Sequence, residues 1–475
     1  MSNSPSANVF ADFPGTFKGP IYRPGDDGYE DVKAIWNARR SEDRPALIVQ
    51  ALDADDVVVA VKYAESKDVP VAVKSGGHGV DASAMPHNAF VIDTSRMKRI
   101  VIEPETGCAT VDAGVLLGEM DVATQKHGYV IPAGVVTRTG VAGLTLGGGI
   151  GNLTRRFGAT VDNLLSVDVV TMDGRKLRVS EETDAELFWG LCGAGHNLAI
   201  ATSFTFQARK VGPQVMSGWI IYTAEAAVPL LAGLDEVMAN APRELTIGPV
   251  VLPAPPVPGL PAEIIGKPIV MAMIVYTGAL EKFESSMRGI RDLAVPAMDL
   301  VKPSTWVEAN SMIDNFVPTG RRQYLLGGYL SAFTRDVARV AIERIAVAPQ
   351  PTGAGPSCLI TFPILGGALF EKSENSTAFS RTGAAWLFEA AGQWDPPGSD
   401  EEYMRWVTDT MSALAPHATA NAYINLTADR GPEWLRGAYG SREKWDRIVA
   451  LKRKWDPHNR LSYNKNVIRA EGRPS

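Results

Sequence analysis

The sequence predicts an α+β fold built from two unlike parts and a short closing segment. With 475 residues, the chain is longer than one compact unit usually is. In its first part, short helix and strand patterns mix without a strict βαβ rhythm. After residue 212, longer strands with alternating polarity are separated by amphipathic helices. We therefore expect one domain over residues 1–212, a second over 213–418, and a C-terminal segment over 419–475.

Short elements are expected in the first part. Residues 1–20 are polar and rich in Pro, Ser and Gly, which predicts a loose arm. Asp53 and the acidic pair after it are typical of a helix cap, and that helix is expected to end near Ser66. Asp173-Gly174 predicts the tip of a hairpin over residues 166–180. Further apolar runs predict strands at 69–73, 90–94, 99–103, 109–114 and 199–208.

The second part predicts an antiparallel sheet with helices on one face. Its expected strands cover residues 218–224, 245–252, 270–278, 357–364 and 384–394. Amphipathic helices are expected near residues 227–240, 280–295 and 334–346. A last helix over residues 442–455 is expected to end at Asp456-Pro457, because proline cannot continue a helix.

Composition and charge narrow the class of protein. Hydrophobic residues make up 45% and charged residues 21%, which is typical of a soluble globular enzyme. The net charge of −6 argues against a nucleic-acid or anionic-membrane partner. The N-terminus lacks the pattern of a signal peptide, and the most apolar run, residues 268–276, is too short to span a membrane. We therefore expect a cytoplasmic protein with no membrane contact. The distant Cys108, Cys192 and Cys358 predict free thiols rather than disulfides or a metal site.

Two glycine-rich segments stand out, KSGGHG (Lys74–Gly79) and GVAGLTLGGGIG (Gly140–Gly151). Glycines allow successive backbone N–H groups to converge on an anion, and a diphosphate is the natural ligand. A Rossmann fingerprint does not fit, because the third glycine is not at the required spacing. A phosphate-binding Walker loop also fails, because no Gly-Lys-Ser/Thr follows. Tight turns without a ligand are the alternative.

His78 is the unusual residue of the first segment, since it lies between Gly77 and Gly79. An imidazole flanked by glycines is free to reach a ligand. No second histidine is close enough in sequence to suggest a metal site. A structural or surface histidine is the alternative.

Three stretches together resemble a known family. They are SGGHG, AGVVTRTGVAGLTLGGGIGNLTRRFGATVDN and ELFWGLCGAGHNLAIATSFTF, and the tail AYINL…LKRKWDPHNRLSYNKNV matches as well. They resemble the berberine-bridge-enzyme-like FAD-linked oxidases of the vanillyl-alcohol-oxidase/PCMH flavoprotein superfamily, over nearly the whole chain. The resemblance implies a PCMH-type FAD-binding domain, a second domain of antiparallel β-sheet covered by helices, and a tail that returns to the FAD domain.

The resemblance also implies a cofactor. One FAD is expected, bonded through its 8α-methyl group to His78, which should raise the flavin potential. Some relatives have a second link, to a cysteine, but Val136 stands at that position here, so a single bond is expected. Lys74 replaces the usual arginine, which keeps the charge but loses the bidentate fork. Further cofactor contacts are implied for Ser75, Gly76, Gly77, Gly79, Gly134, Thr139, Gly140, Gly143, Gly147, Gly148, Asn152, Ile200, Tyr423, Asn425, Asn464 and Asn466. Structural packing is an equal alternative for the last four of these residues.

Two further residues are implied in catalysis. RTGAAWLFEA places Glu389 at the family's catalytic carboxylate, and its apolar flanks predict a raised pKa. A surface glutamate on a strand is the alternative. Leu426 replaces the tyrosine that serves as base in several relatives, which favours Glu389 further. Arg138 is predicted beside the flavin, where a cation would stabilise the anionic reduced ring or attract an acidic substrate.

The implied function is an oxidase. A hydride passes from a small alcohol or amine to flavin N5, and O2 reoxidises the flavin with release of H2O2. An oxygenating flavoenzyme of secondary metabolism, a dehydrogenase that avoids O2, and a flavin-binding protein without turnover are the alternatives. The sequence leaves the substrate and the oligomeric state open.

Overall fold

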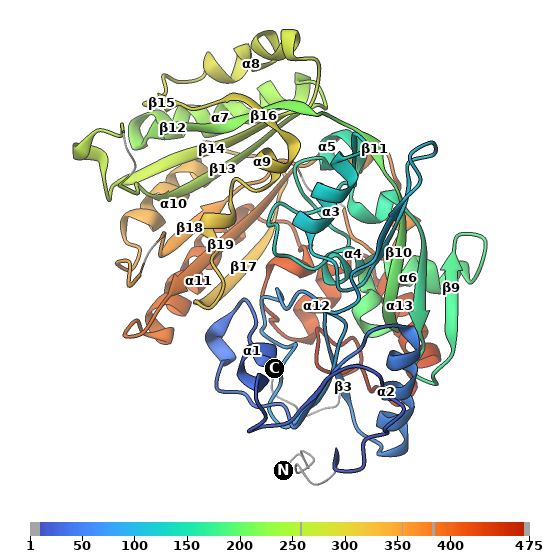
Figure 1. The fold of residues 1–475 in the computed structure, drawn as a ribbon. Coiled ribbons are helices and arrows are strands. Elements are labelled where there is room, and N and C mark those ends of the chain that lie inside the picture. Colours follow the sequence, from blue (N-terminus) through green and yellow to red (C-terminus); the bar gives the residue numbers. More distant parts are fainter. Residues whose placement is uncertain (1–9, 257–258, 354, 382–384, 470–475) are drawn as a thin grey trace.

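The computed structural model describes residues 10–256, 259–353, 355–381 and 385–469. Helices and sheets mix along the chain, so the α+β class is confirmed. Figure 1 shows a large sheet with helices on one side and, beside it, the first part of the chain with two smaller sheets. The first nine residues of the predicted loose arm lie outside the described residues. No helix in the described part of the chain is both long and apolar enough to cross a membrane.

Two sheets form the first part of the chain. In the first sheet, β2 and β3 are parallel to β4, and β1 pairs with β2 in the antiparallel sense. The second sheet is antiparallel throughout, in the order β5-β6-β10-β8-β9. The strands are β1 (Ile21–Tyr22), β2 (Leu47–Gln50), β3 (Val71–Lys74), β4 (Phe90–Asp93), β5 (Ile100–Ile102), β6 (Cys108–Asp112), β8 (Leu164–Val170), β9 (Lys176–Ser180) and β10 (Ile200–Gln207), with the pair β7 (Tyr129–Val130) and β11 (Arg209–Lys210) apart.

Helices cover these sheets and carry the loops between them. Asp53 caps α2, as predicted, by accepting from the backbone N–H groups of Asp55 and Asp56. Gly174 forms the positive-φ turn of the predicted hairpin β8–β9. The helices of this part are α1 (Tyr29–Lys33), α2 (Ala54–Ser66), α3 (Leu117–Gln125), α4 (Val141–Leu146), α5 (Thr154–Phe157) and α6 (Ala185–Ala194).

The second part is one antiparallel sheet in the order β15-β12-β14-β13-β18-β19-β17, with β16 paired to β12. Its strands are β12 (Gln214–Thr223), β13 (Leu245–Pro253), β14 (Pro268–Tyr276), β15 (Met298–Asp299), β16 (Lys302–Thr305), β17 (Arg322–Leu330), β18 (Cys358–Thr361) and β19 (Trp386–Trp394). The five predicted strands are present, and β17 was not predicted. The antiparallel sheet is therefore confirmed, with more strands than expected.

Helices pack on one face of this sheet. Apolar residues of α7 (Ala224–Asn240), α8 (Phe283–Arg291), α10 (Arg335–Ala346) and α11 (Asp400–Leu414) form one core with every second residue of the strands. In β19, Phe388 and Ala390 face this core, whereas the alternate Glu389 and Ala391 face the other way. The opposite face meets the first part of the chain, where Trp36 and Val80 join its apolar cluster. Burial on both faces is why every residue of β19 is buried.

The tail packs against the first part. It contains α12 (Pro432–Ala438) and α13 (Arg442–Trp455), the latter with the predicted bounds, and Asp456 follows it. Ile448 and Leu451 of α13 join the core that holds the five-stranded sheet. Short α9 (Trp306–Asn310) reaches from the second part to α3. The predicted division of the chain at residues 212 and 418 stays a prediction.

A buried ion pair joins the two parts. Arg381, just before β19, donates from Nη2 to Asp162 Oδ1 at 3.0 Å, and their side chains are 2% and 4% exposed. Removing one member of a buried pair leaves the other charge without compensation, at a cost of about 3–5 kcal/mol.

We therefore expect Asp162→Ala to lower the midpoint of thermal unfolding by several degrees. Differential scanning calorimetry measures this. The exposed i,i+4 pair of Arg442 and Asp446 is the control, and Asp446→Ala should shift the midpoint by less than about one degree. Equal shifts in the two variants would contradict the claim that the Arg381–Asp162 ion pair stabilises the contact between the two parts.

Candidate active site

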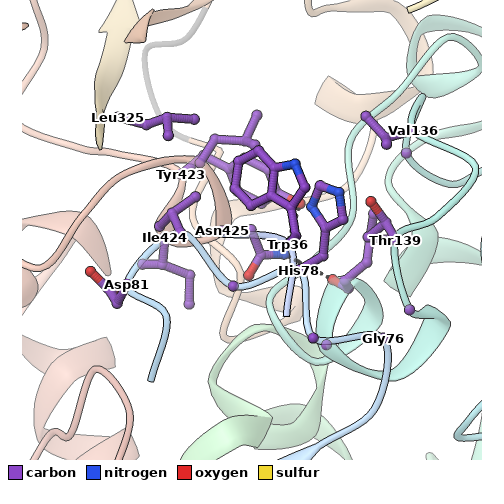
Figure 2. Close-up of a pocket in the computed structure, with 18 of the residues that line it drawn as sticks. Trp36, Gly76, His78, Asp81, Val136, Thr139, Leu325, Tyr423, Ile424 and Asn425 are labelled. Atoms are coloured by element: carbon purple, nitrogen blue, oxygen red, sulfur yellow. Dashed lines mark hydrogen bonds between the residues drawn. The ribbon is translucent and has the colours of Figure 1, made fainter. Parts of the chain in front are cut away.

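One large cavity lies between the two parts of the chain, and its volume of about 410 Å³ is within the range of small-molecule sites. The first part contributes the two glycine segments, the second part contributes the sheet face opposite the helices, and the tail closes the remaining side. Figure 2 shows residues from all three regions around it. A site built at such a junction can hold one ligand between several elements.

The two glycine segments pack directly on each other at this cavity. A Cβ on Gly76 would lie 2.3 Å from the backbone nitrogen of Gly140, and one on Gly140 would lie 2.5 Å from the nitrogen of Gly76. Gly140 caps α4, so the second segment opens a short helix rather than staying a loop throughout. By contrast, a Cβ on Gly79 or Gly143 would meet no described atom within 4 Å. These two glycines leave the cavity wall open to a ligand.

The two kinds of glycine predict different outcomes. Gly140→Ala forces the two segments apart and should destabilise the flavin-free protein by about 1–3 kcal/mol. Gly143→Ala leaves that stability unchanged or slightly higher, because alanine favours a helix. If the flavin packs against α4, as the resemblance implies, both variants should retain less flavin than the wild type. Thermal unfolding of the flavin-free protein and the flavin-to-protein absorbance ratio measure the two effects. Full flavin content in Gly143→Ala would exclude that contact.

Lys74 lies at the end of β3, and its charge is already paired. Its Nζ contacts Asp93 Oδ2 at 3.1 Å and Val32 O at 3.2 Å, and the side chain of Asp93 is fully buried. Ser75 donates from Oγ to Ala113 O at 2.6 Å. Both residues line the cavity, but these bonds hold the glycine segment against the first sheet at Asp93 and against the end of β6 in the second sheet at Ala113.

His78 projects into the cavity from the glycine segment. Its Nε2 is buried and has no hydrogen-bond partner among the described residues. Burial lowers the pKa of His78 to about 4, so the imidazole is neutral at neutral pH. The indole of Trp36 stacks on the imidazole with ring centroids 4.2 Å apart and an interplanar angle of 13°. Figure 2 shows His78 between Trp36 and the segment with Val136 and Thr139.

Glu389 faces the same cavity from the sheet. It lies on β19, opposite Gly327 of β17 and Thr361 of β18, and is 8% exposed. Desolvation raises the pKa of Glu389 to about 8. Its surroundings are apolar, with Ala391 and Leu325 beside it on the cavity face. A surface position for Glu389 is therefore excluded, and the carboxyl group is poised to exchange a proton near neutral pH.

The tail contributes polar groups. Tyr423 accepts through its hydroxyl oxygen from the backbone N–H of Gly149 at 3.1 Å, and burial raises its pKa to about 12. Asn425 donates from Nδ2 to Leu144 O at 3.0 Å and to the Tyr423 hydroxyl oxygen at 2.9 Å. Asn464 donates to the backbone oxygen of His196 at 2.6 Å. These bonds attach the tail to the glycine-rich wall.

The cavity brings together most of the predicted cofactor residues. Its lining includes Lys74, Ser75, Gly76, Gly77, His78, Gly79, Gly134, Thr139, Gly140, Gly143, Ile200, Tyr423, Asn425 and Asn464. Four predicted contacts do not line it, namely Gly147, Gly148, Asn152 and Asn466.

The chain turns these four residues toward other protein groups. Gly147 backs onto the side chain of Asn425, and Gly148 backs onto the ring of Phe379. Asn152 donates from Nδ2 to Asn310 Oδ1 at 3.1 Å, across to the second part. Asn466 donates to Asn459 Oδ1 at 2.9 Å within the tail. Contacts of these four residues with a cofactor stay predictions.

Arg138 does not line the cavity, but in addition to burial its charge lowers the pKa of His78. Its side chain is exposed, and its guanidinium donates to the backbone oxygens of Asp314 at 3.0 Å and Val317 at 3.2 Å. Arg138 thus holds the segment before Gly140 to the second part, together with the bonds from Thr137 to Asp314. A catalytic role for Arg138 stays a prediction.

Several cavity residues were not predicted from the sequence. Trp36 lies 42 positions before His78 in the chain, and no local motif marks it. Lys465 pairs with Asp81 at the cavity wall. Gln393 follows Glu389 by four residues on the same face of β19, so the strand alternation could have revealed it.

Known proteins resemble this chain in sequence and fold. Residues 45–180 match a model of an FAD binding domain. An FAD-linked oxidoreductase of Dictyostelium discoideum is 28% identical over 466 residues, which cover 97% of each chain. The crystal structure of 6-hydroxy-D-nicotine oxidase from Arthrobacter nicotinovorans matches with a TM-score of 0.84 and 25% identity, over 96% of this chain and 99% of that one. BBE-like 1 of Physcomitrella patens shares the fold, with a TM-score of 0.85, 20% identity and coverage of 98% and 100%. The chain therefore contains an FAD binding domain and is similar over nearly its whole length to FAD-linked oxidoreductases and oxidases.

Proposed function

We propose that the chain is an oxidase that holds one FAD, bonded covalently to His78, and oxidises a small alcohol or amine with Glu389 as the base. One observation carries the proposal. A buried carboxyl group with a pKa of about 8 faces the same cavity as a neutral histidine on the first glycine segment. A hydride acceptor and a proton acceptor are what such an oxidation requires.

The residues of the cavity fit FAD in two ways. The glycine wall is open at Gly79 and Gly143, where a diphosphate or ring can approach the backbone. The buried Nε2 of His78 has no partner among the described residues, so it is available for a bond. Val136 lines the cavity at the position where some relatives have a second cysteinyl link, which supports a single covalent bond.

FAD, when bound, accepts the hydride of the substrate and passes the electrons to O2, giving H2O2. The protein supplies the proton acceptor. Glu389 as a carboxylate takes the proton from the O–H or N–H group of the substrate. Leu426 also lines the cavity, but its side chain cannot accept a proton. The base is therefore assigned to Glu389 and not to the tail position that Leu426 occupies.

The sheet face around Glu389 determines which substrates fit the cavity. Met271, Met273, Trp219 and Leu325 line it, and apolar walls of this kind exclude water from the reacting atoms. They favour a substrate with an apolar body that presents one hydroxyl or amine to Glu389. We propose that residues 1–212 bind FAD, residues 213–418 bind the substrate, and residues 419–475 close the FAD site.

An anaerobic test separates this proposal from its alternatives. Members of a panel of alcohols, amines and sugars are each mixed with the protein in the absence of O2. Loss of the flavin absorbance band at roughly 450 nm then reports oxidation of the substrate. Air is then admitted, and H2O2 is measured per substrate consumed. An oxidase releases as much H2O2 as the substrate it consumes. An oxygenating enzyme gives less peroxide, because oxygen enters the product. A protein that bleaches with no member of the panel contradicts the assigned activity.

A further inference from the structure

Trp36 is a buried aromatic residue to which neither the sequence motifs nor the proposed oxidation assigns a role. Its side chain is 4% exposed, and it lies between α1 and the short turn at Ala38–Arg40. Its one ring contact in the described structure is with His78. We propose that Trp36 is a positioning residue that holds the imidazole of His78 in the orientation needed for covalent attachment of the flavin. This inference rests on the proposed function, which supplies the covalent bond.

Little else fixes the imidazole. Gly77 and Gly79 flank His78, and Gly77 has a φ of 65°, so the local backbone carries no side chains that could restrain the ring. Nε2 has no hydrogen-bond partner among the described residues. A hydrogen bond to its own backbone is one restraint on the imidazole, and the nearly parallel stack on Trp36 is the ring contact that limits how it can turn.

Trp36 is itself held from both parts of the chain. Its backbone N–H donates to Gly77 O at 3.0 Å, inside the glycine segment. Its indole Nε1 donates to Val317 O at 3.2 Å, and its backbone oxygen accepts from Gly320 at 2.9 Å, both in the second part. These three bonds fix the indole plane relative to the segment that carries His78. Positioning of the imidazole thus depends on contact between the two parts.

The next residue strengthens this attachment. Asn37 is fully buried and donates from Nδ2 to Val80 O at 2.8 Å and to Gln323 O at 2.9 Å. Its Oδ1 accepts from the backbone N–H of Gln323 at 3.0 Å. Trp36 and Asn37 therefore join residues 77–80 to residues 317–323.

The step that Trp36 assists can be written in full. A ring nitrogen of His78 loses its N–H hydrogen and bonds to the 8α-methyl carbon, which loses one of its hydrogens. The two hydrogens and two electrons reduce one O2 to H2O2. Because the reacting nitrogen must approach one carbon from one direction, misorientation of the imidazole slows this step without changing how tightly the flavin first binds.

The test compares three full-length variants. Trp36→Met fills space without an aromatic face, Trp36→Phe keeps an aromatic face but loses the bond to Val317, and Trp455→Leu removes a buried indole that does not line the cavity. Trp455 is 8% exposed and packs at the end of α13 in the core of the first part. Each flavin-free protein is mixed with FAD in air. Attached flavin is followed by fluorescence of the denatured chain in a gel, and the initial non-covalent affinity by titration.

We expect Trp36→Met to attach flavin about tenfold more slowly, with non-covalent affinity within about a factor of two of the wild type. Trp36→Phe should recover most of the rate, and Trp455→Leu should attach at the wild-type rate. Wild-type attachment in Trp36→Met, or equal slowing in Trp455→Leu, overturns the assignment. If Trp36→Met does not fold, Trp36→Phe and Trp36→Leu are compared instead, and equal attachment rates in these two overturn it. Absence of attached flavin in the wild type contradicts the proposed covalent bond itself.

Discussion

Glu389→Gln is expected to lower the rate of flavin reduction by substrate by about 10²–10⁴-fold. Glutamine has nearly the same shape as glutamate but cannot accept a proton, so the variant tests proton transfer separately from packing. Because burial of an ionised group is costly, the variant should be at least as stable as the wild type above pH 8. Stopped-flow measurement of anaerobic flavin bleaching, with thermal unfolding alongside, gives both quantities.

The pH dependence of the wild type follows from the same residue. The folded-state pKa of Glu389 is about 8, above its usual value, so the carboxyl group is protonated at pH 6 and ionised at pH 10. A base must be ionised, so the rate of flavin reduction should rise with pH, with a midpoint near pH 8. The stability that protonation gives is present below the ordinary pKa and is lost as pH rises through 8. Glu389→Gln should lack this limb of the rate profile.

A matched control separates Glu389 from glutamates in general. Glu343 is exposed on α10, which covers the opposite face of the same sheet. Glu343→Gln should reduce its flavin at the wild-type rate and keep the pH profile. A Glu389→Gln variant with the wild-type rate of reduction ends the assignment of the base.

The second large effect is expected for His78→Ala, which should lose all covalently attached flavin. The glycine wall remains, so the variant should still bind FAD reversibly, and dialysis against guanidinium chloride should remove it. We also expect slower oxidation of substrate, because the covalent bond raises the flavin potential. Gel fluorescence of the denatured chain and anaerobic bleaching measure the two effects.

His196 provides the control for His78. It also lines the cavity, and burial lowers its pKa to about 4, as for His78. Its Nε2, however, lies 2.9 Å from Gly143 O and is engaged in a hydrogen bond. His196→Ala should keep its covalent flavin. Retention of attached flavin in His78→Ala, or its loss in His196→Ala alone, would place the bond on a different residue.

The sequence predicted the parts of the fold that local physics controls. The cap at Asp53, the turn at Gly174 and the last helix at Arg442–Trp455 each depend on a few adjacent residues, and each is present. Strand alternation correctly set Glu389 opposite Phe388. Strand β17 was missed because Gly327-Gly328 interrupts its apolar pattern, and its stability there depends on distant partners, namely β19 and the tail residue Thr427.

The candidate site could be predicted from the sequence only where adjacent residues of one loop all face the cavity. His78 and its flanking glycines lie on one loop, and they reach the cavity together. Gly147 and Gly148 follow Gly143 closely, but the chain turns after α4 and directs them to Asn425 and Phe379. Long-range contacts of this kind, like the stack of Trp36 on His78, arise from the packing of distant segments and leave no local pattern.

The denatured wild-type chain tests the central claim most directly. The protein is made with ample riboflavin, precipitated in acid, washed and digested, and the peptides are separated by fluorescence and identified by mass. We predict that the pellet is yellow and that the fluorescent peptide contains His78 with one FAD-derived adduct. A colourless pellet with all pigment in the supernatant would contradict the covalent bond, and absence of flavin from both fractions would contradict its role as an FAD-linked oxidase.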